Sequence, residues 1–511
     1  MSLITLKFFI FLCVTLIAYY VVPKKAQWMV LLSGSLIFYT LASPKYLLFI
    51  FASAVSTYVC ARLIKGERSK AEAVNSEKSE ATVENKDKSK LYMVLAVVIN
   101  IGILAVLKYT GFFFEIINSI CGSSLPYLRF ILPLGISFYT FMVISYVVDV
   151  YRGDAEAQEN FLKYLLFVSY FPQITEGPIN RYNHTAPALY AERSFDFERC
   201  KNAGYRILLG LFKKVVIAGR FGVYVDRVFE NVSGYGGLTL LVSVVFYAIQ
   251  IYADFSGCMD MVMGISALFG VDMDENFDKP FFSKSVAEFW RRWHITLGSW
   301  VKDYIYDPVF KSDFCRKIKS NLKKTPLKKK STNIIAAIAL MCVWLFTGTW
   351  HGAAMHYVIY GIYYGVIIIF SLFMSNVYKK LHKKLPINWN SKGYHFFEML
   401  RTICIVTVGF LIFRANDMGE VLFVLKTVFT KFSLSGAALS EAILPFTEDN
   451  TALSYGAVAF VSAFIMFFAE ILEYNNIKIL KKHKYFCAAF LIVFTLLFGV
   501  FGESGFLYAA Y

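Results

Sequence analysis

Long apolar runs separated by short polar segments make up nearly the whole chain. Each run has the length of a helix and ends at a charge cluster, a proline or a glycine. This pattern predicts an all-α polytopic membrane protein with about 11–13 transmembrane or re-entrant helices. No sustained alternation of apolar and polar residues indicates membrane strands. The predicted runs are residues 3–22, 27–43, 46–64, 91–108, 130–150, 161–175, 204–229, 238–253, 333–349, 355–376, 396–413, 452–472 and 485–501.

Composition agrees with this class. Of the 511 residues, 57% are hydrophobic and only 17% are charged, whereas a soluble domain is about a quarter charged. The net charge is +16, and the basic residues cluster in loops between the apolar runs. This distribution favours loops at the cytoplasmic membrane face, beside anionic lipid, over a nucleic-acid-binding surface. The nine cysteines form no CxxC pair, so neither a disulfide framework nor a zinc site is indicated.

Two polar segments predict the orientation. Residues 66–90 mix both charges with small polar residues and are predicted to form a disordered cytoplasmic linker between N-terminal helices (1–65) and a core (91–511). Residues 311–330 carry nine Lys or Arg against the single acid Asp313, so this segment is also expected in the cytoplasm. Three apolar runs precede the first linker, and the N-terminus, predicted to be a spanning helix rather than a signal peptide, is therefore expected outside.

The sequence TGTWHG (347–352) closes the run that follows the second basic segment. A helix from residue 333 rises about 1.5 Å per residue, so it has climbed ~26 Å when it meets His351. The return run, 355–376, ends among four lysines between 379 and 384 and so leads back to the cytoplasm. This hairpin is predicted to carry His351 at its tip, deep in the membrane.

A second WH pair lies at 293–294, within the stretch 275–308. The residues Phe289, Trp293, Leu297, Trp300 and Tyr304 recur at helical spacing on one face. One interpretation is an amphipathic helix at the membrane interface, in which His294 is only the neighbour of Trp293. The alternative is that His294 and His351, each beside a tryptophan at the edge of an apolar run, form a buried proton-handling pair.

Polar residues elsewhere in apolar surroundings are further candidates. Gln173 and Arg181 lie in FPQITEGPINRY (171–182), where two prolines and a glycine break any helix. Irregular backbone at membrane depth survives only where protein or a water-filled cavity covers it. This segment is therefore either a cavity wall or a surface loop.

Asp254 and Asp260 lie in an otherwise apolar run, and an acid at that depth is functional or paired by default. An ion pair with Arg291 or Arg292 is the interpretation that we prefer. A metal site is not indicated, because His356 would point about 140° away from His351 on a continuous helix.

These motifs make the chain recognisable. YADFSG (252–257), ENFDKPF (275–281), FWRRWHITLGSWVKDYIY (289–306) and TGTWHGAAMHYVIYGIYYG (347–365) resemble the membrane-bound O-acyltransferase (MBOAT) family, in its bacterial branch around alginate O-acetyltransferase and teichoic acid D-alanyltransferase. The likeness is densest over about 130–370. It implies a ring of tilted helices around a central funnel, in the cytoplasmic membrane of a bacterium.

The resemblance also implies the chemistry. The invariant histidine of the family matches His351, and its second motif histidine matches His294. The donor is an acyl thioester, acetyl-coenzyme A or an acyl carrier protein, used from inside, and the acceptor is a hydroxyl of an exported polysaccharide or a secreted partner protein. No bound cofactor or metal is expected. The basic segment after DYIY (303–306) departs from the alginate-type pattern and is a candidate contact for the donor.

A neutral imidazole can take the proton of a hydroxyl as it attacks a thioester, which is worth ~10²–10⁴-fold. We expect His351 to be this base, with Gly352 leaving room for substrate. Trp350 and Trp293 are expected to line the tunnel, together with Asp254, Gln173 and Arg181. His294 is expected to orient the acceptor, relay the proton or help to hold the oxyanion.

Three alternatives stay open. D-alanyl transfer from a carrier protein to teichoic acid fits the same motifs as acetyl transfer. A polysaccharide or lipid-linked-sugar transporter would predict internal repeats with broken helices, and no such repeat is found. A scaffold with an inactive site is disfavoured because both histidines are present.

Overall fold

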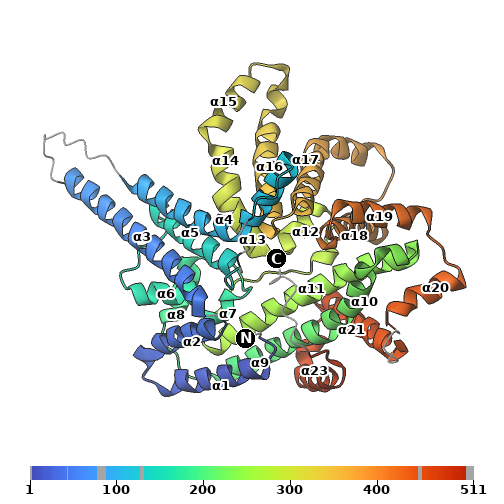
Figure 1. Ribbon diagram of the computed structural model, residues 1–511, viewed down its shortest axis with the longest axis horizontal. Helices are drawn as coiled ribbons and strands as arrows, with labels where there is room; N and C mark the ends of the chain where they lie inside the picture. The colour runs from blue at the N-terminus through green and yellow to red at the C-terminus, as the bar shows by residue number, and fades with distance from the viewer. Residues whose placement is uncertain are drawn as a thin grey trace. The chain divides into compact units, whose positions relative to one another are not determined.

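Each predicted apolar run is helical over most of its length in the computed structural model (Figure 1). The structure describes residues 3–42, 44–76, 88–126, 130, 132–446 and 452–501. Within these ranges there is no strand, and the one isolated β-bridge joins Phe277 and Trp293. The protein is therefore all-α.

The described chain divides into two units. The first comprises Met1–Ile207 and Met259–Asp274, and the second comprises Leu208–Cys258 and Glu275–Gly502. The helices α9 (Phe197–Phe212) and α11 (Gly237–Leu268) contribute residues to both units.

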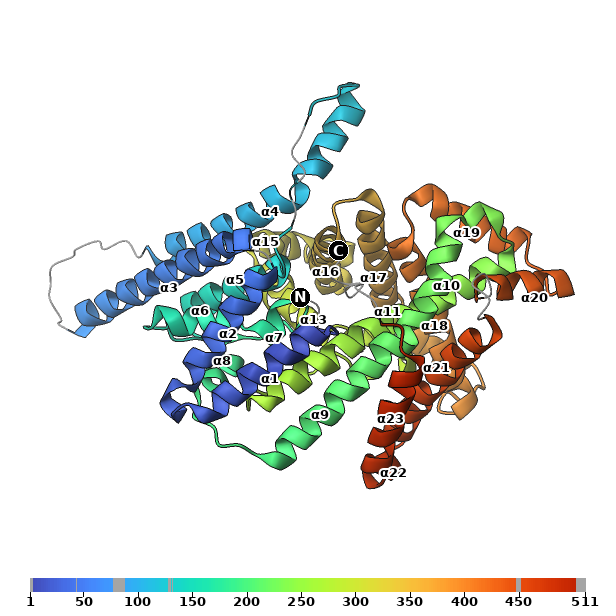
Figure 2. The same ribbon diagram turned by 60° about the horizontal axis from the view of Figure 1, so that its bottom comes forward.

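The first unit contains the N-terminal helices. Figure 2 shows α3 and α4 side by side in this unit, and the two helices pack together. The α-helices that lie wholly in this unit are α1 (Leu6–Val21), α2 (Gln27–Ala42), α3 (Leu47–Ser76), α4 (Ser89–Cys121), α5 (Ile136–Arg152), α6 (Phe161–Ser169), α7 (Phe171–Ile174) and α8 (Tyr182–Tyr190).

Helix α3 continues ten residues beyond the point where the linker was expected to begin. It runs to Ser76, so the first part of the predicted segment 66–90 is helical. Its central part, 77–87, lies outside the described residues. The mixed charges of residues 66–76 suggested disorder. An exposed polar helix can have the same charged composition as a disordered linker, so composition did not distinguish the two.

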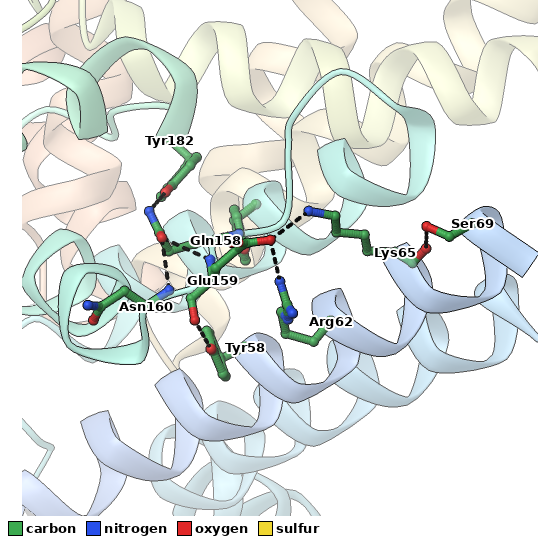
Figure 3. A network of polar contacts seen from close by, with 9 residues as sticks. Tyr58, Arg62, Lys65, Ser69, Gln158, Glu159, Asn160 and Tyr182 are labelled. Carbon is green, nitrogen blue, oxygen red and sulfur yellow. Dashed lines mark hydrogen bonds and ion pairs between the residues drawn. The ribbon is translucent and has the colours of Figure 1, made fainter.

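A polar network ties the loop before α6 to α3 (Figure 3). The Glu159 carboxylate lies 3.0 Å from the Lys65 ammonium and 3.4 Å from the Arg62 guanidinium. The Tyr58 hydroxyl donates to the Glu159 carbonyl, and the Gln158 amide donates to Tyr182. Because Glu159 is exposed, these ion pairs position the loop more than they stabilise the fold.

The second unit holds the two WH motifs and the α16–α17 hairpin. Its elements are a π-helix η3 (Lys213–Ala218), α10 (Gly219–Glu230), α12 (Val286–Arg292), α13 (Ile295–Val301), a π-helix η6 (Lys302–Tyr306), α14 (Asp307–Lys311), α15 (Asp313–Leu322), α16 (Ser331–His351), α17 (Met355–Lys384), α18 (Lys392–Arg414), α19 (Met418–Thr430), α20 (Gly436–Ile443), α21 (Ala452–Tyr474), α22 (Ile479–Lys482) and α23 (Lys484–Phe498).

Helices α16 and α17 lie side by side in both views (Figures 1 and 2). A Cβ on Gly348 would collide with the carbonyl oxygen of Tyr357, and one on Gly361 would collide with that of Trp344. Small residues let the two backbones approach directly, as is common between membrane helices. The hairpin predicted around residue 351 is present, and this close packing holds its two arms together.

Seven of the described helices are long and apolar enough to cross a membrane. The 11–13 segments expected from the sequence divide into these and into shorter helices, such as α2 and α5. Together with the family evidence below, the seven establish a multi-pass membrane protein. The seven are Pro44–Lys70, Ser89–Cys121, Gly237–Leu268, Pro326–His351, Met355–Lys384, Lys392–Arg414 and Tyr455–Tyr474.

The aromatic stripe of residues 289–304 does not lie on one continuous helix, so that prediction was wrong. The chain breaks at His294, where φ is +50° and ψ is 52°. The break is held by pairing with an earlier segment, in which the Ile295 N–H donates to the Asn276 carbonyl and the Asp278 N–H donates to the Arg292 carbonyl. A left-handed residue with a side chain costs about 1–2 kcal/mol, which these bonds offset.

Candidate active site

His351 is the last residue of α16 and is buried, with 4% of its surface exposed. Its ring is enclosed by aromatic rings from three elements. The ring centroid lies 4.7 Å from Trp350, 5.0 Å from Phe413 of α18 and 5.7 Å from Tyr360 of α17. The hairpin tip therefore presents an imidazole to an aromatic environment from which water is largely excluded.

His294 lies between α12 and α13 and is also buried, at 3% exposure. The Phe255 ring from α11 packs edge-on against it at 4.9 Å. Burial penalises the imidazolium form and lowers the pKa of His294 well below its usual value. The ring is accordingly neutral at physiological pH.

The side chain of Asn276 selects the tautomer of His294. The Asn276 Oδ1 atom lies 3.0 Å from the Thr296 backbone nitrogen, 2.9 Å from Thr296 Oγ1 and 3.1 Å from His294 Nδ1. A backbone N–H can only donate, so the atom that faces it must be the amide oxygen. An oxygen can only accept, and His294 therefore carries its proton on Nδ1 and its lone pair on Nε2.

Trp350 connects the two histidines. Its ring centroid lies 6.2 Å from that of His294 and 4.7 Å from that of His351. The imidazoles can therefore be no further apart than the sum of these two distances. The two WH motifs, distant in sequence, meet in one aromatic cluster within the second unit.

The space beside Gly352 is filled by an aromatic ring. The sequence suggested that it leaves room for a substrate, but a Cβ at this position would collide with the Tyr357 ring. The absent side chain makes room for that ring. Trp293 is likewise a core residue, because it is 3% exposed and its ring stacks on Phe289 at 5.4 Å.

Asp254 is paired, but not with the partner that we preferred. Its carboxylate lies 2.5 Å from the Lys214 ammonium of the π-helix η3, and both side chains are buried. Arg292 instead contacts Glu288 at 2.9 Å. Asp260 belongs to the first unit, where it contacts Arg206 at 3.1 Å. The predicted ion pairs with Arg291 or Arg292 were therefore wrong, and Asp254 is an ion-pair partner of Lys214.

Gln173 and Arg181 belong to the first unit. Gln173 is 2% exposed, and its Oε1 accepts a hydrogen bond of 3.0 Å from the Asn180 amide. Arg181 precedes the first residue of α8. Nearly all residues from 171 to 180 are buried, which excludes the interpretation of this segment as a surface loop.

Three polar residues near the histidines were not predicted from the sequence. Asn276 is one, and the others are Tyr360 and Trp290, whose rings contact each other. Asn276 lies in the quoted motif ENFDKPF, but its contact with a histidine 18 residues later is not visible in the pattern. Among the described residues, no group of three or more His, Cys, Asp or Glu side chains is placed to hold a metal ion.

Comparison with known proteins adds the family evidence. The model of the MBOAT, membrane-bound O-acyltransferase, family matches residues 36–322. The chain is 28% identical over 479 residues to a peptidoglycan O-acetyltransferase of Helicobacter pylori, covering 86% of this chain and 82% of the relative. It is 28% identical over 459 residues to a probable alginate O-acetylase of Pseudomonas aeruginosa, covering 88% and 79%.

A third relative transfers a different acyl group. A teichoic acid D-alanyltransferase of Bacillus subtilis is 28% identical over 288 residues, which cover 55% of this chain and 69% of the relative. The similarity to the two O-acetyltransferases thus extends over more of this chain than the similarity to the D-alanyltransferase.

Proposed function

Because the chain belongs to the membrane-bound O-acyltransferase family and is an O-acyltransferase, we propose that it moves an acetyl group from a cytoplasmic thioester to a hydroxyl of an extracytoplasmic polysaccharide. The donor is acetyl-coenzyme A or an acetylated carrier protein. The two O-acetyl-transferring relatives match more of this chain than the D-alanyltransferase does, which favours acetyl over D-alanyl transfer. The observation that carries the proposal is the pair of buried histidines on either side of Trp350.

The reaction needs one base. A neutral His351 accepts the proton of the acceptor hydroxyl while its oxygen attacks the thioester carbonyl carbon. The new C–O bond forms, the C–S bond breaks, and the proton passes to the departing thiolate. General-base assistance of this kind is worth ~10²–10⁴-fold.

The tautomer of His294 limits the hydrogen bonds that its ring can make. With its proton on Nδ1 and held by Asn276, the neutral ring offers a lone pair at Nε2 and no donor there. His294 therefore accepts a hydrogen bond from a second hydroxyl of the acceptor sugar, which orients the attacking hydroxyl toward His351. Of the three roles that the sequence left open, this excludes donation to the oxyanion from Nε2.

The charge distribution supports a cytoplasmic donor. The segment before α16 carries nine Lys or Arg and the single acid Asp313, and most of these side chains are exposed. The last residues of α17 are basic as well. Both ends of the hairpin therefore suit the cytoplasmic face of a bacterial membrane, in the orientation that also puts the N-terminus outside.

The proposal is tested by replacing the histidine at the hairpin tip. We expect His351→Ala to lower base-labile acetate on the cell-envelope polysaccharide at least 100-fold, with normal protein level and melting temperature. His356→Ala is the matched control, because that histidine lies on α17 and packs on Tyr357. Wild-type acetate levels in His351→Ala cells would overturn the proposal, and a loss of D-alanine in place of acetate would assign the other acyl group.

A further inference from the structure

Two hydrogen-bond donors, one on a ring that contacts His351 and one on the next ring, have no acceptor among the described residues. Tyr360 is 2% exposed, and its hydroxyl makes no hydrogen bond to another described residue. The Trp290 Nε1–H group is buried and likewise has no partner in the described part of the chain. Their rings meet at right angles, with centroids 6.3 Å apart.

Two neighbouring tyrosines of α17, by contrast, do have acceptors. The Tyr363 hydroxyl donates to the Ile405 carbonyl at 2.8 Å, and the Tyr364 hydroxyl donates to the Val406 carbonyl at 3.1 Å. Both acceptors are on α18. Buried donors are nearly always satisfied, and one that is not destabilises the fold. The buried Trp290 N–H, together with the Tyr360 hydroxyl on the ring packed against it, therefore points to an acceptor that arrives with a ligand.

The position of Tyr360 identifies the kind of acceptor. Its ring packs edge-on against His351, with centroids 5.7 Å apart. A hydroxyl activated at His351 attacks a carbonyl carbon, and the carbonyl oxygen then becomes an oxyanion. Donors placed beforehand in a dry site stabilise this charge strongly, and His294 does not supply one from Nε2.

We propose that the Tyr360 hydroxyl and the Trp290 indole N–H bind the carbonyl oxygen of the acyl donor. This inference rests on the proposed acyl transfer and adds to it two catalytic residues. As the C–O bond forms, the carbonyl π electrons move to this oxygen, where the two donors hold them. They return to carbon when the C–S bond breaks, and the thiolate takes the proton from His351. The two groups themselves gain and lose no proton.

The test compares two substitutions that each remove one hydroxyl and no carbon. Tyr360→Phe should lower the maximal rate of transfer about 100-fold, with the KM for the donor within about threefold, because the oxyanion forms only during reaction. Its melting temperature should equal or exceed that of wild type, since the hydroxyl has no partner to lose. Tyr364→Phe should do the opposite, with a lower melting temperature and a rate within about threefold of wild type.

The probe is labelled acetyl-coenzyme A supplied to membrane vesicles that contain the full chain, and the readout is label in base-labile polysaccharide ester. Trp290→Phe in the Tyr360→Phe background should lower the rate further. A Tyr360→Phe rate within threefold of wild type, or a loss that appears only in KM, would overturn the inference. His351→Ala separates the two claims: if it is inactive while Tyr360→Phe is normal, only the inference fails, and if it is active, the proposed function fails.

Discussion

Replacement of Asn276 by alanine tests whether a side chain outside the reacting pair sets the protonation pattern of His294. The substitution removes one acceptor from three buried donors, namely His294 Nδ1 and the N–H and hydroxyl of Thr296. The hydroxyl can rotate, but the Thr296 N–H cannot. His294 can respond by moving its proton to Nε2, which removes the lone pair that the reaction uses.

Asn276→Ala should lower both the stability of the protein and the rate of transfer. A buried N–H without an acceptor costs about 1–3 kcal/mol, so we expect Asn276→Ala to lower the unfolding free energy by about 2 kcal/mol. The hydrogen bond that selects the tautomer is worth about 0.5–1.5 kcal/mol, a factor of up to roughly ten in the ratio of tautomers. We therefore expect the maximal rate of acetyl transfer to fall roughly tenfold.

The assay measures the rate of acetyl transfer and the ¹⁵N NMR spectrum of protein labelled in the histidine rings. The His294 resonances are assigned as those that disappear in His294→Gln. Thr296→Val is the matched control: it removes one donor to the same oxygen and leaves the bond to Nδ1, so the tautomer and the rate should both be retained. Asn276→Asp keeps an acceptor and should keep the Nδ1–H form. A wild-type resonance typical of Nε2–H, or an unchanged tautomer in Asn276→Ala, would refute the reasoning.

Three further predictions concern stability, measured by thermal unfolding in detergent. Gly361→Ala should destabilise the protein by about 1–3 kcal/mol through overpacking against the Trp344 carbonyl, whereas Gly393→Ala, which meets nothing within 4 Å, should be neutral or stabilising. Lys214→Met should lower the unfolding free energy by about 3–5 kcal/mol, because it removes one partner of a buried ion pair, and adding Asp254→Leu should recover most of this loss. The lowered pKa of His294 means that the unfolded chain takes up a proton below pH about 6.5 while the folded chain does not. Stability should therefore fall as the pH drops below that value, by up to about 1.4 kcal/mol per unit, and less so in His294→Gln.

The long helices could be predicted from the sequence because their cause is local. An apolar run bounded by charges has few alternatives to a helix when the surrounding solvent is lipid, and α16 and α17 begin within two residues of their expected starts. The place of His351 at the end of a helix follows from the same pattern. Its aromatic surroundings could not be predicted, because 18% of all residues are aromatic and no spacing marks those that meet.

The break at His294 has a cause that is not local. The stripe from Phe289 to Tyr304 has a helical period, but Asn276 and Asp278 form hydrogen bonds with the same stretch and hold His294 in a left-handed conformation. The partner of Asp254 is similarly remote, 40 residues earlier in the chain. Pairings of this kind depend on which helices pack together, and a single sequence does not contain that information.

The hydrogen-bonding roles at the site also decide what drives the proposed transfer. The hydroxyl gives its proton to His351, His351 returns it to the thiolate, and Tyr360 and Trp290 donate hydrogen bonds without ionising. The donor keeps its charge when its thioester becomes a thiol, and the acceptor keeps its charge when its hydroxyl becomes an ester. Neither side of the membrane gains or loses charge, so the membrane potential, worth about 2.3 kcal/mol per charge per 100 mV, contributes nothing. The thioester alone must drive the reaction, and a site of neutral imidazoles and uncharged donors is sufficient for it.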